Sequence, residues 1–401
     1  MKKQLVKLTM LLLAIVLGGS NAWAQKVIFE RAKASSWTAD DATATGAVAD
    51  NSNGLFLSCS SAGKEAETIS AKKSFEFTSG SKVTLVTEIK MGNDCGNATS
   101  YDYFTFGGLT LKVYRKKDPT VDAFKFSVDG GEEQVLPAGT PQSATYKITF
   151  VIDQATGVAS YALNINDDVK ACGTTTTTTA LSAVEFGHVF NKAKKSAKVS
   201  LKSLKIVEET APASINLTLN TSEDYTYSTF SPEWDLDFSS ITDVEAYKAT
   251  VSGENVVTER ITGKVRAYEG LLIKNVNHVA SVSIPTTTEA TALEGNNLVG
   301  VTAPLSASNF TGKTAYILTS DTEFQLITDA STNKLAKGKA YLELPAEAAA
   351  KPSSLFFGEA TGINGVAVEK KADNAIYNLQ GMRVKTPTKG LYIVNGKKYR
   401  F

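Results

Sequence analysis

Alternation of apolar and polar residues constrains the fold of this chain more than any other feature. Tyr146–Ile152 carries its apolar side chains on one face, and Val158–Ile165 repeats the pattern after the loop Asp153–Gly157. Successive side chains of a strand point to opposite faces, so the pattern predicts two half-buried strands joined by a hairpin. Helical periodicity is not sustained in this half of the chain. We therefore expect β-structure.

Similar short strands, separated by glycine-rich turns, follow one another through residues 25–209, which is typical of a two-layer β-sandwich. A polar linker, Glu208–Pro212, introduces a second β-rich segment over residues 213–358. Residues 359–401 form the remainder. The fold class predicted is all-β: an N-terminal jelly-roll-like β-sandwich, a second β-sandwich-like domain and a small C-terminal β-hairpin module.

The first 24 residues have the three parts of a secretory signal peptide. Basic residues at the start precede Leu8–Leu17, an apolar run too short to span a membrane as a stable anchor. Ala22 and Ala24 supply the small residues expected at the −3 and −1 positions of a cleavage site. The sequence therefore predicts export with Gln25 as the new N-terminus. No later segment is long and apolar enough to predict a transmembrane helix.

Net charge and cysteine content argue against a protein that binds nucleic acid or anionic membranes by bulk charge, and against a cysteine metal site. The leader holds three of the 42 basic residues and none of the 41 acidic ones, so the mature chain carries 39 − 41, a net charge of about −2. No bulk affinity for nucleic acid or anionic membrane is expected at this charge. Cys59, Cys95 and Cys172 allow one bridge at most and lack metal-ligand spacing, which favours buried apolar cysteines.

The C-terminal segment Ala375–Phe401 is basic, with no acidic residue, and Asn395–Gly396 predicts a two-residue hairpin in which Tyr392 faces Tyr399. The order IYNLQGMRV followed by KGLYIVNGKK resembles the C-terminal sorting domain of type IX (Por) secretion substrates of Gram-negative bacteria. That resemblance implies secretion machinery as a partner and a cell-surface (outer-membrane) or extracellular location. The residues that carry it are Gly381, Arg383, Lys389, Gly390, Tyr392, Asn395 and Gly396.

Three segments of the first domain resemble the strands of a known fold. The segments FEFTSGSKVTLVTEIK, YKITFVIDQATGVASYALNIN and KVSLKSLKIVEE, in this order, resemble the strands of concanavalin A-like (laminin G-like) jelly rolls. Such folds often carry carbohydrate sites, although a fold does not imply a function.

Candidate ligand-binding residues lie in two loop-like segments. Sugar binding needs an exposed aromatic ring with amide or carboxylate groups beside it, and Trp37, Tyr101, Tyr103 and Asp102 have such surroundings. The same region offers a set of oxygen ligands that could chelate Ca²⁺, the one cofactor considered. These residues are Asn93, Asp94, Asn97 and Asp102. The alternative is that the Asn, Asp and Gly residues only form a turn and that Tyr103 belongs to the core.

Catalytic signals are sparse. Glu233, Asp235 and Asp237 would share a strand face, as the carboxylates of retaining glucanases do, but the last position is Glu in that family and Asp here. No nucleophile elbow, metalloprotease helix or phosphate loop is present in the sequence. The function predicted is a non-catalytic binding protein for glycans or host surfaces. The alternatives are a structural or adhesive surface protein without a sugar site, and a glycoside hydrolase or lyase.

Overall fold

A computed structural model of the chain describes seventeen ranges of residues. These are 25–30, 47–51, 54–59, 67–91, 100–114, 124–136, 145–190, 197–222, 226–252, 255–320, 322–328, 334–344, 353–357, 376–377, 383–384, 391–394 and 397–400. The chain forms two compact units, Met1–Phe357 and Gly358–Phe401. The signal-peptide residues Ala22 and Ala24 lie outside the described ranges.

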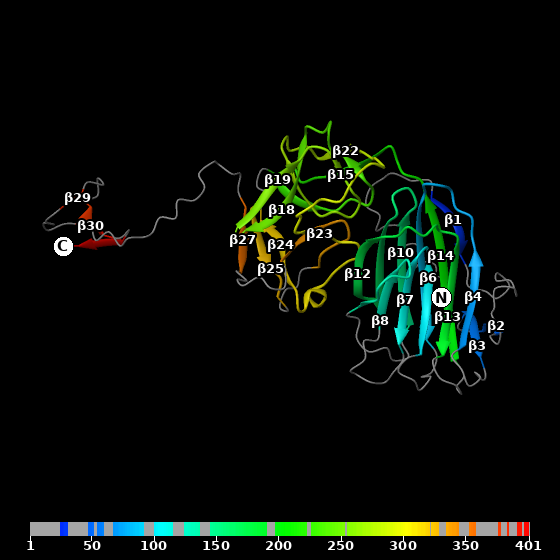
Figure 1. Cartoon of the computed structure of the whole chain (residues 1–401). Coiled ribbons are helices and arrows are strands. Elements are labelled where there is room, and N and C mark those ends of the chain that lie inside the picture. The colour runs from blue at the N-terminus through cyan, green and yellow to red at the C-terminus, as the bar shows by residue number, and fades with distance from the viewer. Residues whose placement is uncertain are drawn as a thin grey trace, which may run out of the picture. The chain divides into compact units, whose positions relative to one another are not determined.

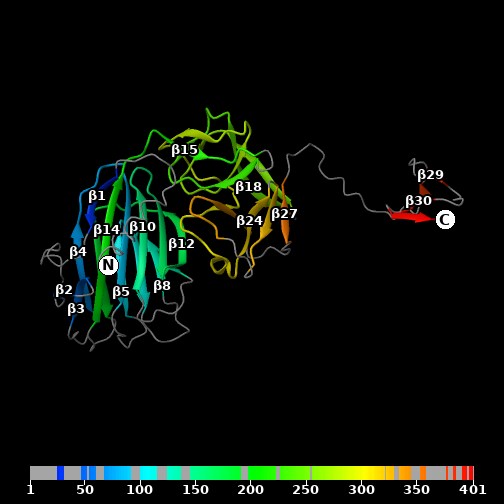
Figure 2. The same cartoon turned by 180° about the vertical axis from the view of Figure 1, so that it is seen from behind.

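The first part of the larger unit is a sandwich of two antiparallel sheets (Figures 1 and 2). One sheet runs in the order β12-β11-β10-β5-β14-β3-β2, with β1 also paired to β14. Its strands are β1 (Gln25–Glu30), β2 (Ala47–Asn51), β3 (Gly54–Cys59), β5 (Lys82–Met91), β10 (Thr145–Asp153), β11 (Val158–Ile165), β12 (Asp168–Thr176) and β14 (Ala197–Glu209). The other sheet runs β4-β13-β6-β7-β8-β9. Its strands are β4 (Glu67–Ser74), β6 (Tyr101–Phe106), β7 (Leu109–Tyr114), β8 (Phe124–Val128), β9 (Gln134–Val135) and β13 (Ala183–Phe190).

The chain passes repeatedly from one sheet to the other. It goes from β3 to β4, from β4 to β5, from β5 to β6 and finally from β13 to β14. Strands that are neighbours in sequence therefore often lie in opposite layers, as in a jelly roll. The predicted all-β fold with an N-terminal sandwich is confirmed.

The hairpin that the sequence predicts most clearly is present. β10 and β11 pair antiparallel, with Tyr146 opposite Ile165 and Ile152 opposite Ala159. Gly157 closes the loop at φ 71°, a backbone angle at which glycine carries no steric cost. The alternation in the sequence then decides which side chains face the second sheet.

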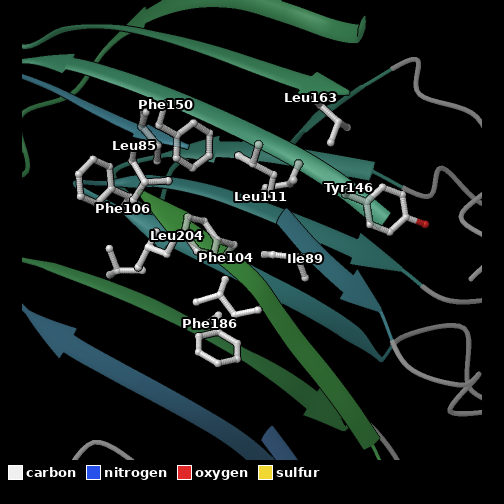
Figure 3. Close-up of a cluster of buried hydrophobic side chains, with 14 of the residues drawn as sticks. Leu85, Ile89, Phe104, Phe106, Leu111, Tyr146, Phe150, Leu163, Phe186 and Leu204 are labelled. Atoms are coloured by element: carbon white, nitrogen blue, oxygen red, sulfur yellow. The ribbon is translucent and has the colours of Figure 1, made fainter. Parts of the chain in front are cut away.

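The core fills the space between the two sheets. Phe150 from β10 lies between Phe104 and Phe126 of the opposite sheet, with ring centroids 6.1 and 6.2 Å apart. Tyr146 packs edge-on against Phe124 at 5.2 Å. Figure 3 shows this cluster, to which both layers contribute. Most of these side chains are completely buried, so apolar burial stabilises the sandwich.

The second part of the larger unit is also built from strands. Its main sheet has the order β16-β21-β18-β19-β27-β25-β24-β26-β23, and two small sheets pair β15 with β22 and β17 with β20. The main sheet comprises β16 (Tyr227–Phe230), β18 (Val244–Ser252), β19 (Asn255–Ile261), β21 (Leu271–Asn275), β23 (Leu298–Gly300), β24 (Thr314–Ser320), β25 (Glu323–Leu326), β26 (Ala340–Leu344) and β27 (Ser354–Phe356). The small sheets comprise β15 (Ser214–Thr218), β17 (Leu236–Asp237), β20 (Lys264–Val265) and β22 (Ser281–Pro285), and one short 3₁₀ turn, η4, covers Ala307–Phe310.

The smaller unit contains one four-stranded sheet in the order β29-β28-β30-β31. Its strands are β28 (Ile376–Tyr377), β29 (Arg383–Val384), β30 (Leu391–Val394) and β31 (Lys397–Arg400). Tyr392 lies opposite Tyr399 and Val394 opposite Lys397, the register that the Asn-Gly turn predicts. Of the residues that carry the sorting resemblance, Arg383 and Tyr392 lie in strands. Gly381, Lys389, Gly390, Asn395 and Gly396 fall outside the described residues.

Within the described part of the chain, no helix has the length and apolarity needed to cross a membrane.

Candidate functional site

The candidate site is on the outer face of the six-stranded sheet. Along β6, Phe104 and Phe106 point into the core, whereas Tyr101 and Tyr103 point away from it and are half-buried. Alternation along β7 places Tyr114 on the same outer face, directly opposite Tyr101. The ring centroids of Tyr101 and Tyr114 are 5.1 Å apart, and those of Tyr101 and Tyr103 are 6.5 Å apart. We call Tyr101, Tyr103 and Tyr114 the tyrosine platform.

Tyr103 is held in place by the neighbouring strand β13. Its hydroxyl donates a hydrogen bond of 2.7 Å to Glu185 Oε1. Gly187 on β13 lies under the ring, since a Cβ there would come within 2.8 Å of Tyr103 Cε1 and 2.3 Å of the Ile69 carbonyl oxygen. Burial, followed by the hydrogen bond to Glu185, raises the pKa of Tyr103, so the phenol stays protonated. A larger residue at position 187 would displace this ring.

Two lysine ammonium groups, held by Glu133, lie over the rings of the other two tyrosines. Glu133 accepts from Lys112 Nζ at 2.6 Å and forms an ion pair with Lys125 at 3.2 Å. The Lys112 ammonium lies 4.9 Å from the Tyr101 ring centroid, and that of Lys125 lies 4.8 Å from Tyr114. The hydrogen bond from Lys112 is the largest cause that lowers the pKa of Glu133, so this carboxylate stays ionised. Burial raises the pKa of Tyr114 to about 12.

Asp102 lies on the other side of the same strand. Its side chain is completely buried and its Oδ1 is 2.8 Å from Nδ1 of His188, which is also completely buried. The sequence interpretation grouped Asp102 with Tyr101 and Tyr103, but adjacent residues of a strand face opposite sides of the sheet. Asp102 therefore belongs to the core and does not share a ligand with the platform.

The remaining predicted site residues lie outside the described ranges. This holds for Trp37 and for the possible calcium ligands Asn93, Asp94 and Asn97. Among the residues that the structure describes, no three His, Cys, Asp or Glu side chains gather as a metal site. Asp102, the fourth predicted calcium ligand, is buried against His188, so the calcium site stays a prediction for Asn93, Asp94 and Asn97.

The three carboxylates of the glucanase-like motif are engaged separately. Glu233 forms an ion pair with Lys337 at 2.6 Å, and Asp235 accepts from the backbone N–H of Ala267 at 2.8 Å. Asp237 accepts from the backbone N–H of Ser239 at 2.8 Å, an Asx turn. Only Leu236–Asp237 of this segment is a strand, so the predicted shared strand face does not form.

Cys172 is a free thiol on β12. It packs against an apolar cluster of the second part of the unit, which includes Val301 and Leu305. Burial raises the pKa of the Cys172 thiol, as expected for a structural cysteine.

Sequence reasoning missed Tyr114, Lys112, Lys125 and Glu133. Alternation of apolar and polar residues along Leu109–Tyr114 is the signal in the sequence that indicates an outward Lys112 and Tyr114. The pairing of β7 with β6, which brings Tyr114 to Tyr101, is a tertiary fact. Glu133 precedes β9 in a non-regular segment, and nothing in the sequence tied it to the two lysines.

Comparison with solved structures finds proteins of similar architecture at low identity. Peanut lectin with a nine-residue peptide is 12% identical, with a TM-score of 0.32, covering 47% of this chain and 99% of the lectin. The lectin UEA-II complexed with galactose is 9% identical, with a TM-score of 0.32, covering 45% and 98%. An endo-1,3-β-glucanase from Streptomyces sioyaensis is 11% identical, with a TM-score of 0.32, covering 48% and 100%. These likenesses are too weak to carry any statement about activity.

No protein-family model matches the sequence, and no characterised protein matches it either.

Proposed function

We propose that the chain is an exported, non-catalytic glycan-binding protein that holds its ligand on the tyrosine platform. The observation that carries this proposal is the clustering of Tyr101, Tyr103 and Tyr114 on one sheet face, with charged groups among their rings. Aromatic rings stack on the apolar faces of sugars, and polar side chains at their edge receive the hydroxyl groups. The ligand would be a glycan of a cell or host surface.

The electrostatics of the platform support binding without catalysis. A glycosidase needs one carboxylic acid that is protonated at working pH beside a second carboxylate. Glu133 is paired with both Lys112 and Lys125, which keeps its pKa below the usual range. Glu185 accepts the hydrogen bond of the Tyr103 hydroxyl. Glu133, whose pKa is lowered, is therefore not suited to the role of general acid.

A glycan-array screen of the full chain tests the proposal. We expect selective binding, and we expect Tyr101→Ala and Tyr114→Ala to weaken it at least about fivefold, because stacking of a ring on a ligand is worth roughly 1 kcal/mol or more. Running the array with and without Ca²⁺ tests the predicted site at residues 93–97 in the same experiment.

Tyr247→Ala is the matched control. Its hydroxyl also donates to a carboxylate, Glu245 Oε2 at 2.5 Å, but it lies on β18 in the second part of the unit. This variant should bind as the wild type does. A blank array with folded protein, or equal losses in all three variants, would favour the structural or adhesive function.

The proposed destination rests on the two ends of the chain. The apolar run Leu8–Leu17 with Ala22 and Ala24 supports export, and the hairpin around Asn395–Gly396 supports recognition by secretion machinery at the cell surface. We expect deletion of Ala375–Phe401 to leave the protein in the periplasm, as measured by fractionation and surface labelling. Normal surface display of the truncated chain would contradict the sorting role of the tail.

A further inference from the structure

A cleft of about 290 Å³ lies inside the larger compact unit, away from the tyrosine platform. One wall is the segment Gly173–Thr176 of β12, and the other is formed by Arg266–Gly270 and Leu298–Gly300 of the second part. The cleft is open to solvent and is large enough for a few residues of an extended chain.

Two apolar contacts, one on each side of the cleft, fix the position of its two walls relative to each other. On one side, Val158 of β11 packs against Ala267 and Tyr268. On the other, Val169 and Cys172 of β12 pack into the cluster of the second part that contains Val301 and Leu305. Asn309 Nδ2 also donates to the Val169 carbonyl oxygen, at 2.5 Å. Because both contacts are made by the protein alone, the cleft exists before any ligand binds.

The first wall is the edge of a sheet. Among the described strands, β12 pairs only with β11. Thr177 N–H donates to the Gly157 carbonyl oxygen at 2.9 Å, which fixes the hydrogen-bond alternation along the antiparallel pair. In an antiparallel pair every second residue bonds to the partner strand, so Thr175 and Gly173 also direct their backbone groups toward β11. The backbone N–H and C=O groups of Thr174 and Thr176 then point away from β11, toward the cleft that these residues line. Thr174 and Thr176 are both exposed.

Along Gly173–Thr176 this edge lacks the charged side chains, proline and bulges that normally prevent strand addition, although the second part of the unit covers β12 at Val169 and Cys172. Protected edges carry charged side chains, proline or a bulge, or they are covered by another element. The segment Gly173–Thr176 has no charged residue and no proline. The irregularity in the pairing of β11 with β12 lies elsewhere, between Leu163 and Asn164.

Arg266 stands at one end of this edge with most of its donors unused. Its guanidinium donates to the Thr176 hydroxyl, and among the described residues no carboxylate is close enough to form an ion pair with it. Two carboxylates attract it from farther away: burial raises the pKa of Asp235 and of Glu269, and the charge of Arg266 partly opposes both shifts. An arginine offers five N–H donors in a fork that fits a carboxylate.

From this juxtaposition we infer that the cleft binds an extended peptide that adds a strand to β12 and places a carboxylate on Arg266. The backbone groups of Thr174 and Thr176 supply the main-chain hydrogen bonds of strand addition. Val299 of the opposite wall, which is 37% exposed, is an apolar surface for a side chain of the peptide. The carboxylate comes from an acidic residue or from the C-terminus of the peptide. This site is independent of the glycan-binding function proposed for the tyrosine platform.

Selection from a phage-displayed library of random peptides on the immobilised full chain tests the inference. We expect enrichment of extended sequences that carry Asp or Glu. Synthetic versions of the enriched peptides, with free and with amidated C-termini, then show by fluorescence polarisation which carboxylate meets Arg266.

Two variants locate the binding. Arg266→Gln should lower the affinity for the enriched peptides at least about tenfold, because a charge-assisted bidentate contact is lost. Thr174→Pro removes an outward N–H from the edge of the sheet, where proline is tolerated, and should also lower the affinity for these peptides.

Arg260→Gln is the matched control, since Arg260 is paired with Glu245 at 2.9 Å and lies outside the cleft. It should leave peptide affinity unchanged, as should Tyr101→Ala. Failure to enrich any sequence, or enriched peptides that bind Arg266→Gln as tightly as the wild type, would overturn the inference. The Arg266→Gln result decides the question even if Thr174→Pro impairs folding.

Discussion

Phe150→Ala is expected to lower the free energy of unfolding by about 3–5 kcal/mol, the range for removing a large aromatic side chain from a packed core. Phe150 lies at the centre of the sandwich and contacts aromatic rings of the opposite sheet. Its side chain is 2% exposed. Both the apolar transfer and the cavity left behind contribute to the loss, because neighbouring strands are fixed by their ladders and cannot close in.

Urea denaturation followed by far-UV circular dichroism measures this loss. Val135→Ala serves as the control in the same sandwich, since Val135 is 50% exposed on β9. That substitution should change the unfolding free energy by less than about 0.5 kcal/mol. A loss below about 1.5 kcal/mol for Phe150→Ala would mean that this side chain is not enclosed between the two sheets.

The second large effect concerns Lys82, which connects the sandwich to the second part of the larger unit. Lys82 begins β5, and its side chain is almost completely buried. The ammonium lies 3.7 Å from the Trp234 ring centroid and 5.5 Å from that of Tyr268, and it donates to the Glu233 carbonyl oxygen. It is therefore a cation enclosed by aromatic rings at the contact between the two parts.

Burial lowers the pKa of Lys82 from 10.5 to about 8. Asp153, Glu233 and Glu209 oppose this shift by attraction, and Lys337 adds to it by repulsion. Since the pKa is lower in the folded state, the unfolded chain binds more protons between about pH 8 and pH 10.5. Stability must then rise with pH across this window, and below about pH 8 the full cost of the buried charge is present.

We expect this group to add about 2 kcal/mol of stability between about pH 7 and pH 9.5, from roughly 1.4 kcal/mol per unit of pKa shift. The measurement is urea unfolding at several pH values for the wild type and Lys82→Met. The difference between the two proteins isolates Lys82, because the tyrosines and Cys172 titrate in both. Lys205→Met, whose lysine side chain is exposed, is the control, and its unfolding free energy should change with pH as that of the wild type does. Equal pH profiles for the wild type and Lys82→Met would contradict the buried cation.

How far the sequence determines the candidate site is clear from β6. Alternation in Tyr101–Phe106 is enough to place Tyr101 and Tyr103 together and to exclude Asp102 from their face, a consequence that the sequence interpretation did not draw. The sequence alone could not bring in Tyr114, Glu185 or Glu133. Tyr114 and Glu185 reach the platform through pairing of β6 with β7 and β13, and Glu133 through its ion pairs with Lys112 and Lys125. Such partners are not encoded in the period of a single strand.

The sequence by itself determined the β class, the hairpin of β10 with β11, and the register at Asn395–Gly396, because each depends on the alternation of adjacent residues or on the φ angles of a two-residue turn. Only the tertiary structure decided which strands share a sheet, that Lys82 lies between Trp234 and Tyr268, and that the edge of β12 lines a cleft. The physical reason is that these features depend on contacts between residues far apart in sequence. Such contacts form where apolar surfaces fit, and a local pattern specifies that a surface is apolar but not what covers it.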